Sequence, residues 1–241
     1  MNDEQLIWEA YESSIEDPMN RVMFPDSKKQ ETVGEFIERH DLTLEDGYII
    51  LYHGTPKKTK LTNSAIKAWS YFAKTPIESL HYSTRDRGLK PSSVVVYKVR
   101  VSPQELEYSG FYQTNKDISL KERATSLKLT DIIKDYLIDN GFVDNNNNTP
   151  EVNSNGTVTL YHNTKSEEAA NAIIKKRDWK SKEGRQIFFS TKPNLQTTGY
   201  GNITLKVNVD PEEMVLDDVF DDELHVWVSS DNLKRYPVAL I

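Results

Sequence analysis

Nearly the same five residues occur twice in this chain, as LYHGT at 51–55 and as LYHNT at 160–164. Two further segments return in the same order, with the paired stretches SYFAKTP at 70–76 and IFFSTKP at 187–193, and YKVRVSPQEL at 97–106 and LKVNVDPEEM at 205–214. The copies lie 109 residues apart at the histidine, 117 at the proline and 108 in the last segment. Repetition in a fixed order indicates an internal duplication of a β-rich unit of roughly 75 residues.

The hydrophobic pattern predicts strands in these repeated segments and helices outside them. Apolar, β-branched runs at 48–55 and 93–103 are typical of strands. Amphipathic spacing predicts short helices at 4–12 and 32–39, and a longer helix that starts at Thr130 or Asp131 and stops at Gly141. We therefore predict an α+β fold made of two tandem units.

An asparagine-rich stretch separates the two copies and predicts a domain boundary. The sequence VDNNNNTPEVNSNGT holds little that can bury apolar surface, so we interpret it as a flexible linker. The predicted organisation is a helical N-terminal segment, a first unit, a helix with the Asn-rich linker, and a second unit, at 1–45, 46–125, 126–156 and 157–241.

Composition excludes several classes of function. The chain has 30 basic and 37 acidic residues, and its net charge of −7 disfavours a nucleic acid partner. It has no cysteine, which excludes disulfides, thiolate ligands and thiol nucleophiles. Its five histidines lack the spacing of metal ligands, and no Gly-rich phosphate loop occurs. No apolar stretch is long enough to cross a membrane and no secretory signal is evident, so we expect a soluble, cytoplasmic protein.

The repeated Tyr-His-x-Thr motif places polar side chains on a strand that is otherwise apolar. Alternation puts His53 and Thr55 on one face, and the second copy repeats this with His162 and Thr164. Such a histidine is either a hydrogen-bonded core residue or part of a site. Gly54 lets another group approach the backbone of the first copy, whereas Asn163 stands at the same position in the second.

Aromatic residues repeat beside the second shared segment. Tyr71 and Phe72 in the first copy match Phe188 and Phe189 in the second. A tyrosine follows the shared proline by six residues at Tyr82 and by seven at Tyr200. These rings form either an ordinary sheet core with an outer tyrosine, or a clamp for a flat and possibly cationic heterocycle.

A carboxylate accompanies the repeated motifs in the second copy alone. The strand DDELHVWV at 221–228 places Glu223, His225 and Trp227 on one face. In the first copy Tyr112 or Gln113 falls nearest to that position, and neither is acidic.

Taken together, His-Gly-Thr, Tyr-Phe-Ala, a later tyrosine and a strand opened by glutamate resemble the ADP-ribosyltransferase fold. The resemblance is to its His-Tyr-Glu branch, that of diphtheria toxin and the poly-ADP-ribose polymerases, and covers 48–119 and 157–236. It implies NAD as cofactor and substrate. The implied catalytic residues are Glu223, His162 and Tyr200, and the implied NAD-binding residues are His53, Gly54, Thr55, Tyr71, Tyr82, Thr164, Phe188 and Ser190. The second copy departs from the pattern at Asn163 and Phe188, and the first lacks the glutamate.

The chemistry of this resemblance leaves several functions open. Cleavage between ribose and nicotinamide builds positive charge on the ribose, which a fixed carboxylate stabilises. The second copy would then transfer ADP-ribose to a macromolecule, with a protein favoured over nucleic acid, or hydrolyse NAD. Alternatively, both copies bind a nucleotide or a protein without chemistry, or the chain is a structural or assembly protein of viral type. A first copy that is active through Gln113 is the remaining option.

Overall fold

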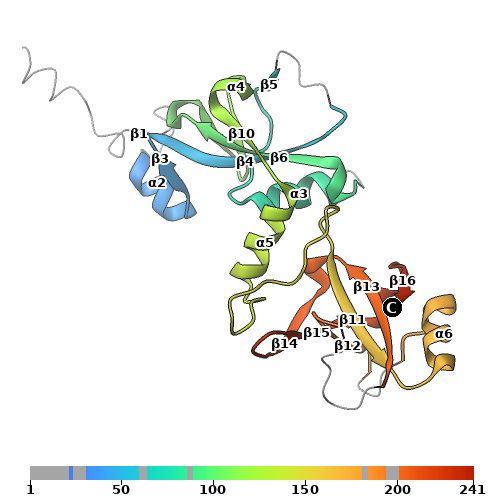
Figure 1. The fold of residues 1–241 in the computed structure, drawn as a ribbon. Coiled ribbons are helices and arrows are strands. Elements are labelled where there is room, and N and C mark those ends of the chain that lie inside the picture. The colour runs from blue at the N-terminus through green and yellow to red at the C-terminus, as the bar shows by residue number, and fades with distance from the viewer. Residues whose placement is uncertain (1–21, 24–30, 60–63, 86–88, 181–183, 194–200) are drawn as a thin grey trace, which may run out of the picture. The chain divides into compact units, whose positions relative to one another are not determined.

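The computed structural model describes residues 22–23, 31–59, 64–85, 89–180, 184–193 and 201–241. The chain has the predicted α+β fold, rich in antiparallel strands, and divides into a first unit at 1–127 and a second at 128–241 (Figure 1). The helix predicted at 4–12 lies outside the described residues.

The first unit opens with helix α2, Val33–His40, which confirms the helix predicted at 32–39. A capping box starts it, because Thr32 Oγ1 accepts from the Glu35 amide at 3.2 Å and the Glu35 carboxylate accepts from the Thr32 amide at 2.9 Å. The helix ends at Asp41, whose φ is 53°. The N-terminal segment is not purely helical, since it also holds strands β1 (Val22–Met23), β2 (Glu31–Thr32) and β3 (Thr43–Glu45).

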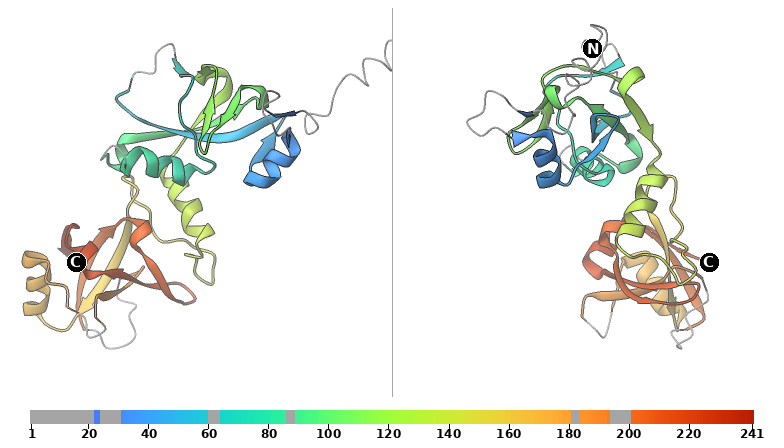
Figure 2. Two further views of the ribbon diagram at one scale, coloured as in Figure 1. Left: turned by 180° about the vertical axis from the view of Figure 1, so that it is seen from behind. Right: turned by 90° about the vertical axis from the view of Figure 1, so that its left-hand side faces the viewer.

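The main sheet of the first unit is antiparallel, in the order β10-β6-β4-β3. Its central strands are β4 (Tyr48–Pro56) and β6 (Val94–Val101), as predicted, with β10 (Ala124–Leu127) at the edge. Helix α3, Pro76–Arg85, lies along β4 and β6 (Figure 2). The remaining elements are β5 (Ala65–Ile66), β7 (Leu106–Tyr108), β8 (Tyr112–Thr114), β9 (Ile118–Ser119), α4 (Leu120–Arg123) and 3-10 turns at Pro91–Ser93 and Pro103–Glu105.

The second unit is built on one antiparallel sheet, in the order β14-β15-β12-β11-β13-β16. Its strands are β11 (Val158–Thr164), β12 (Gln186–Ser190), β13 (Ile203–Val209), β14 (Val215–Val219), β15 (Leu224–Ser229) and β16 (Val238–Leu240). Its helices are α5 (Leu129–Asp139), α6 (Glu167–Lys176), α7 (Ser230–Leu233) and a 3-10 turn at Pro211–Glu213.

Strand pairing in the two units corresponds position by position, which supports the predicted duplication. The repeated histidines pair with the next repeated strand at equivalent places, as His53 with Tyr97 and His162 with Leu205. The preceding tyrosines pair with the aromatic segment at equivalent places too, as Tyr52↔Ala73 and Tyr161↔Ser190. The repeated segments therefore keep the same pairing partners, although β3, which pairs with β4, has no counterpart among the described strands of the second unit.

The Asn-rich stretch differs from the flexible linker we expected. It folds as a turn of the second unit, because the Asp144 carboxylate accepts from the Asn146 and Asn148 amides and the Asn145 amide donates to the Phe220 carbonyl at 3.1 Å. Hydrogen bonds order this segment, and its four consecutive asparagines stay exposed. The boundary between the units lies instead at 127/128.

Helix α5 begins slightly earlier than predicted. Its N-cap is Lys128, with no side-chain capping bond, so neither Thr130 nor Asp131 caps the helix. Gly141 adopts a φ of 77° beyond the last turn, as expected of a stop signal.

Candidate functional site

The first repeated histidine lies on β4 beside the segment 70–74. Tyr52 forms an isolated bridge with Ala73 of that segment, and the next residue, His53, pairs with Tyr97 of β6. Its Nδ1 lies 2.9 Å from the Tyr71 carbonyl oxygen, and its ring centroid lies 5.4 Å from that of Phe72. Since a carbonyl oxygen accepts only, Nδ1 carries the proton, and this bond fixes the ring.

A cleft of about 540 Å³ opens beside His53 in the first unit. It has the size of a small-molecule site. Residues from β4, the segment 70–74, α3 and the β7–β8 turn line it, among them His53, Gly54, Tyr71, Glu78, Tyr82 and Phe111. The structure thus brings four predicted positions of the first copy around one opening.

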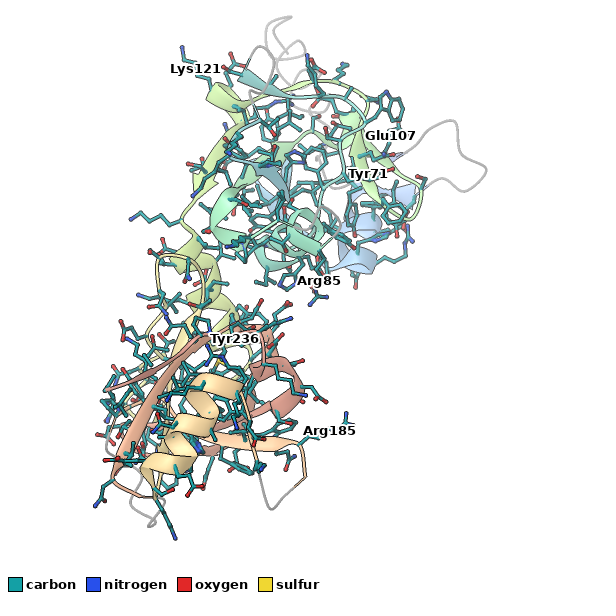
Figure 3. All side chains as sticks on the ribbon, turned by 90° about the vertical axis from the view of Figure 1, so that its right-hand side faces the viewer. Tyr71, Arg85, Glu107, Lys121, Arg185 and Tyr236 are labelled. Carbon is teal, nitrogen blue, oxygen red and sulfur yellow. The ribbon has the colours of Figure 1, made fainter. Side chains whose placement is uncertain are left out.

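Three aromatic side chains at the cleft are exposed. Tyr71, Tyr82 and Phe111 keep 64%, 56% and 57% of their surface accessible. The Tyr71 and Phe111 rings meet edge to face, with centroids 5.6 Å apart. Figure 3 shows Tyr71 on the side of the first unit that carries Glu107 of β7. Exposed rings gathered at a concave site offer flat apolar faces to a ligand.

Gly54 allows the close approach to the backbone that we inferred, and the approaching group is helix α3. A Cβ at this position would lie 2.3 Å from Ser83 Oγ and 2.5 Å from the Ser79 carbonyl oxygen, both on α3. Glycine is therefore required for the close approach of α3 to β4, although Gly54 also lines the cleft. Thr55, the predicted partner of His53, is buried and does not line the cleft.

A hydrogen bond to helix α2 holds Tyr112, one of the residues that line the cleft, in place. The Tyr112 hydroxyl lies 3.0 Å from Nδ1 of His40 on α2. Burial raises the pKa of Tyr112 to about 12 and lowers the pKa of His40, so both groups are uncharged at neutral pH. Sequence reasoning missed Phe111 and Glu78 as cleft residues because neither belongs to a repeated motif.

The second repeated histidine makes the same backbone contact and packs against two aromatic rings. His162 Nδ1 lies 2.8 Å from the Phe188 carbonyl oxygen, and its ring packs 5.5 Å from both Phe189 and Trp179. Burial lowers the pKa of His162 below its ordinary value. Trp179 is itself buried and was not foreseen, because it lies outside the duplicated segments.

The predicted glutamate lies in a small buried polar cluster. Glu223 is only 6% exposed, and its carboxylate accepts from Ser190 Oγ and lies 3.2 Å from His225 Nε2. Ser190 pairs with His225 across β12 and β15 and therefore shares a sheet face with it. Ser190, a predicted cofactor-binding residue, thus contacts Glu223 directly.

The second unit does not bring His162 and Glu223 together in the described residues. His162 pairs with Leu205, on the face opposite to the one that Ser190 shares with Tyr161. Thr164 is buried, and Tyr200 lies outside the described residues. The expected convergence of His162 and Glu223 is therefore not seen.

Strand pairing also identifies the first-unit position that matches Glu223. Phe72 pairs with Tyr112 as Phe189 pairs with Val226. Three residues before Tyr112 stands Ser109, which corresponds to Glu223. The prediction that the first copy lacks this carboxylate agrees with the pairing, but the matching residue is neither Tyr112 nor Gln113.

Comparisons with known proteins add no relative from which a function can be transferred. No protein-family model, no curated protein and no solved structure matches this chain. The described residues contain no group of three or more side chains suited to holding a metal ion. None of the helices in the described part combines the length and apolar character needed to cross a bilayer.

Proposed function

We propose that the first unit binds a nucleotide of the NAD type in the cleft beside His53. The observation that carries this proposal is that His53, Gly54, Tyr71 and Tyr82, from three separate chain segments, line one opening. A planar base or nicotinamide would stack on the exposed rings, a contact worth about 1–3 kcal/mol for each base. The imidazole, oriented by the Tyr71 carbonyl, then hydrogen-bonds the sugar.

Removal of one stacking ring should weaken this binding without unfolding the unit. Tyr82→Ala truncates an exposed side chain on α3, so its stability cost is small. By calorimetric titration we expect the Kd for NAD and for ADP-ribose to rise about 10-fold or more. The control is Tyr48→Ala, since Tyr48 stands at the other end of β4 and does not line the cleft. Equal affinities of the Tyr82 and Tyr48 variants would contradict the proposal, as would failure of the wild type to bind either nucleotide.

A second candidate function is cleavage of NAD by the second unit, in transfer of ADP-ribose to a protein or to water. The specific observation in its favour is the Glu223 carboxylate, which Ser190 and His225 hold in a buried place. In this reaction the ribose–nicotinamide bond breaks, nicotinamide leaves with the bonding electrons, and the acceptor oxygen or nitrogen attacks the ribose carbon and loses its proton. Glu223 would stabilise the positive charge on the ribose.

This candidate predicts that nicotinamide release depends on one carboxylate. With labelled NAD, Glu223→Gln should lower the rate of release about 100-fold. Asp222→Asn is the matched control, because Asp222 is the adjacent acid, exposed, and only 3.7 Å from Lys192 in a surface ion pair. Absence of release by the wild type, or equal rates in the two variants, would remove the candidate while leaving nucleotide binding by the first unit untouched.

A further inference from the structure

From the geometry of the cleft we infer that Glu78 makes the first unit select a cationic ring over a neutral ring of the same shape. This inference rests on the proposed nucleotide binding and specifies the ligand further. It concerns a residue outside the duplicated motifs, on a helix that has no described counterpart in the second unit.

Glu78 is held in the cleft by its position on α3. Its backbone amide donates to Thr75 Oγ1 at 3.2 Å in the first turn of the helix. Tyr82 follows four residues later, so the carboxylate and the phenol ring project from one helix face, and both line the cleft. A ligand stacked on Tyr82 therefore lies next to the carboxylate.

The charge of Glu78 is available to a ligand. No lysine or arginine of the described part of the chain forms an ion pair with it, and its side chain is half-buried. Partial burial weakens solvent screening, so the carboxylate acts more strongly on a ligand in the cleft than a fully exposed one does. Its negative charge also contributes to the raised pKa of Tyr112 across the cleft.

The aromatic walls act in the same direction as Glu78. The faces of Tyr71, Tyr82 and Phe111 carry the negative part of the ring quadrupole and attract a cation placed over them. Rings combined with a carboxylate are the arrangement that recognises a delocalised or quaternary cation, such as a pyridinium.

Lys74 is the opposing charge at the cleft, and it does not cancel the effect. Its side chain is exposed, and its ammonium lies 3.8 Å from the Asp41 carboxylate, so solvent and this partner reduce its field inside the cleft. The ammonium group of Lys74 can bind a phosphate group of a ligand in the cleft. A ligand with a cationic ring and a phosphate group matches both charges, as the oxidised form of a nicotinamide dinucleotide does and its reduced form does not.

The test compares ligands that differ in ring charge. Calorimetric titrations of the full chain with NAD⁺ and NADH should give a Kd about 10-fold lower for NAD⁺. Glu78→Gln, which keeps the shape of the side chain, should reduce this preference to within about 2-fold while leaving the Kd for NADH within about 2-fold of the wild type. Glu107→Gln is the control, because Glu107 belongs to the same unit but does not line the cleft, and it should keep the full preference.

A second pair of probes isolates the ring from the rest of the dinucleotide. The cation 1-methylnicotinamide should displace NAD⁺ from the wild type at a lower concentration than neutral nicotinamide, and Glu78→Gln should abolish that difference. Equal binding of NAD⁺ and NADH, or a preference that survives in Glu78→Gln, overturns the inference and leaves nucleotide binding standing. Absence of binding by both dinucleotides overturns the proposed function and this inference together.

Discussion

Gly54→Ala is expected to lower the free energy of unfolding of the first unit by about 2–4 kcal/mol, or roughly 10–20 °C in Tm. The added methyl group would overlap the Ser79 carbonyl oxygen and Ser83 Oγ, which lie 2.5 Å and 2.3 Å from its position. The hydroxyl can rotate away, but the carbonyl belongs to the α3 backbone, so the helix must move off β4. Scanning calorimetry of the full chain measures this as a shift of the first-unit transition.

The duplication supplies a matched control for this variant. Asn163 occupies the same position of the second copy and already carries a side chain. Asn163→Ala should therefore cost the second unit no more than about 1.5 kcal/mol. Equal stability of Gly54→Ala and the wild type would show that α3 does not depend on close contact with β4. The same variant should also weaken nucleotide binding, because α3 carries Tyr82 into the cleft.

Trp179→Ala is expected to cost the second unit about 3–5 kcal/mol, the usual range for removal of a buried tryptophan. Trp179 is 7% exposed, and its ring packs 5.5 Å from His162 and 5.6 Å from Phe189. Trp179→Phe is the control, because Nε1 has no hydrogen-bond partner among the described residues and a smaller ring still fills most of the space. Urea unfolding measures the free energy of unfolding of the second unit in both variants. An equal loss of stability in Trp179→Ala and Trp179→Phe would contradict the packing account.

Trp179→Ala should also change how His162 titrates. Burial lowers the pKa of His162, so the unfolded chain takes up a proton at this residue more readily than the folded one. The second unit therefore loses stability as pH falls below about 6.5, the ordinary histidine pKa. Admission of water beside the ring raises the folded-state pKa and reduces that loss. NMR titration of the His162 ring should show the upward shift in Trp179→Ala and a much smaller one in Trp179→Phe.

The repeated segments of the two units keep the same pairing, but the surroundings of their histidines differ. His53 borders an open cleft with exposed aromatic residues, whereas the His162 ring packs against Trp179. The carboxylate Glu223 occurs in the second unit, and Ser109 takes its place in the first. The features expected of one NAD site are thus divided between the copies. This division favours nucleotide binding by the first unit over NAD cleavage by the second.

Much of the fold was predictable from local sequence. Strands β4 and β6 fall where apolar, β-branched runs placed them, β11 and β13 fall on the repeats of those runs, and α2 falls on its amphipathic pattern. These patterns report which face of an element is buried, and burial drives the packing. The Asn-rich stretch was misjudged because its order comes from hydrogen bonds to Asp144 and Phe220, which leave no trace in hydrophobic periodicity.

The sequence alone determined the duplication and the residue types that recur at each repeat, because a repeated pattern of apolar and polar residues specifies the same strand pairing twice. Only the tertiary structure decided which histidine borders a cleft, since that depends on whether α3 or Trp179 lies beside it. It also decided that Glu78 and Phe111 join the cleft and that Glu223 contacts Ser190. Contacts between residues far apart along the chain follow from how helices and loops pack on the sheet, and no local pattern encodes that packing.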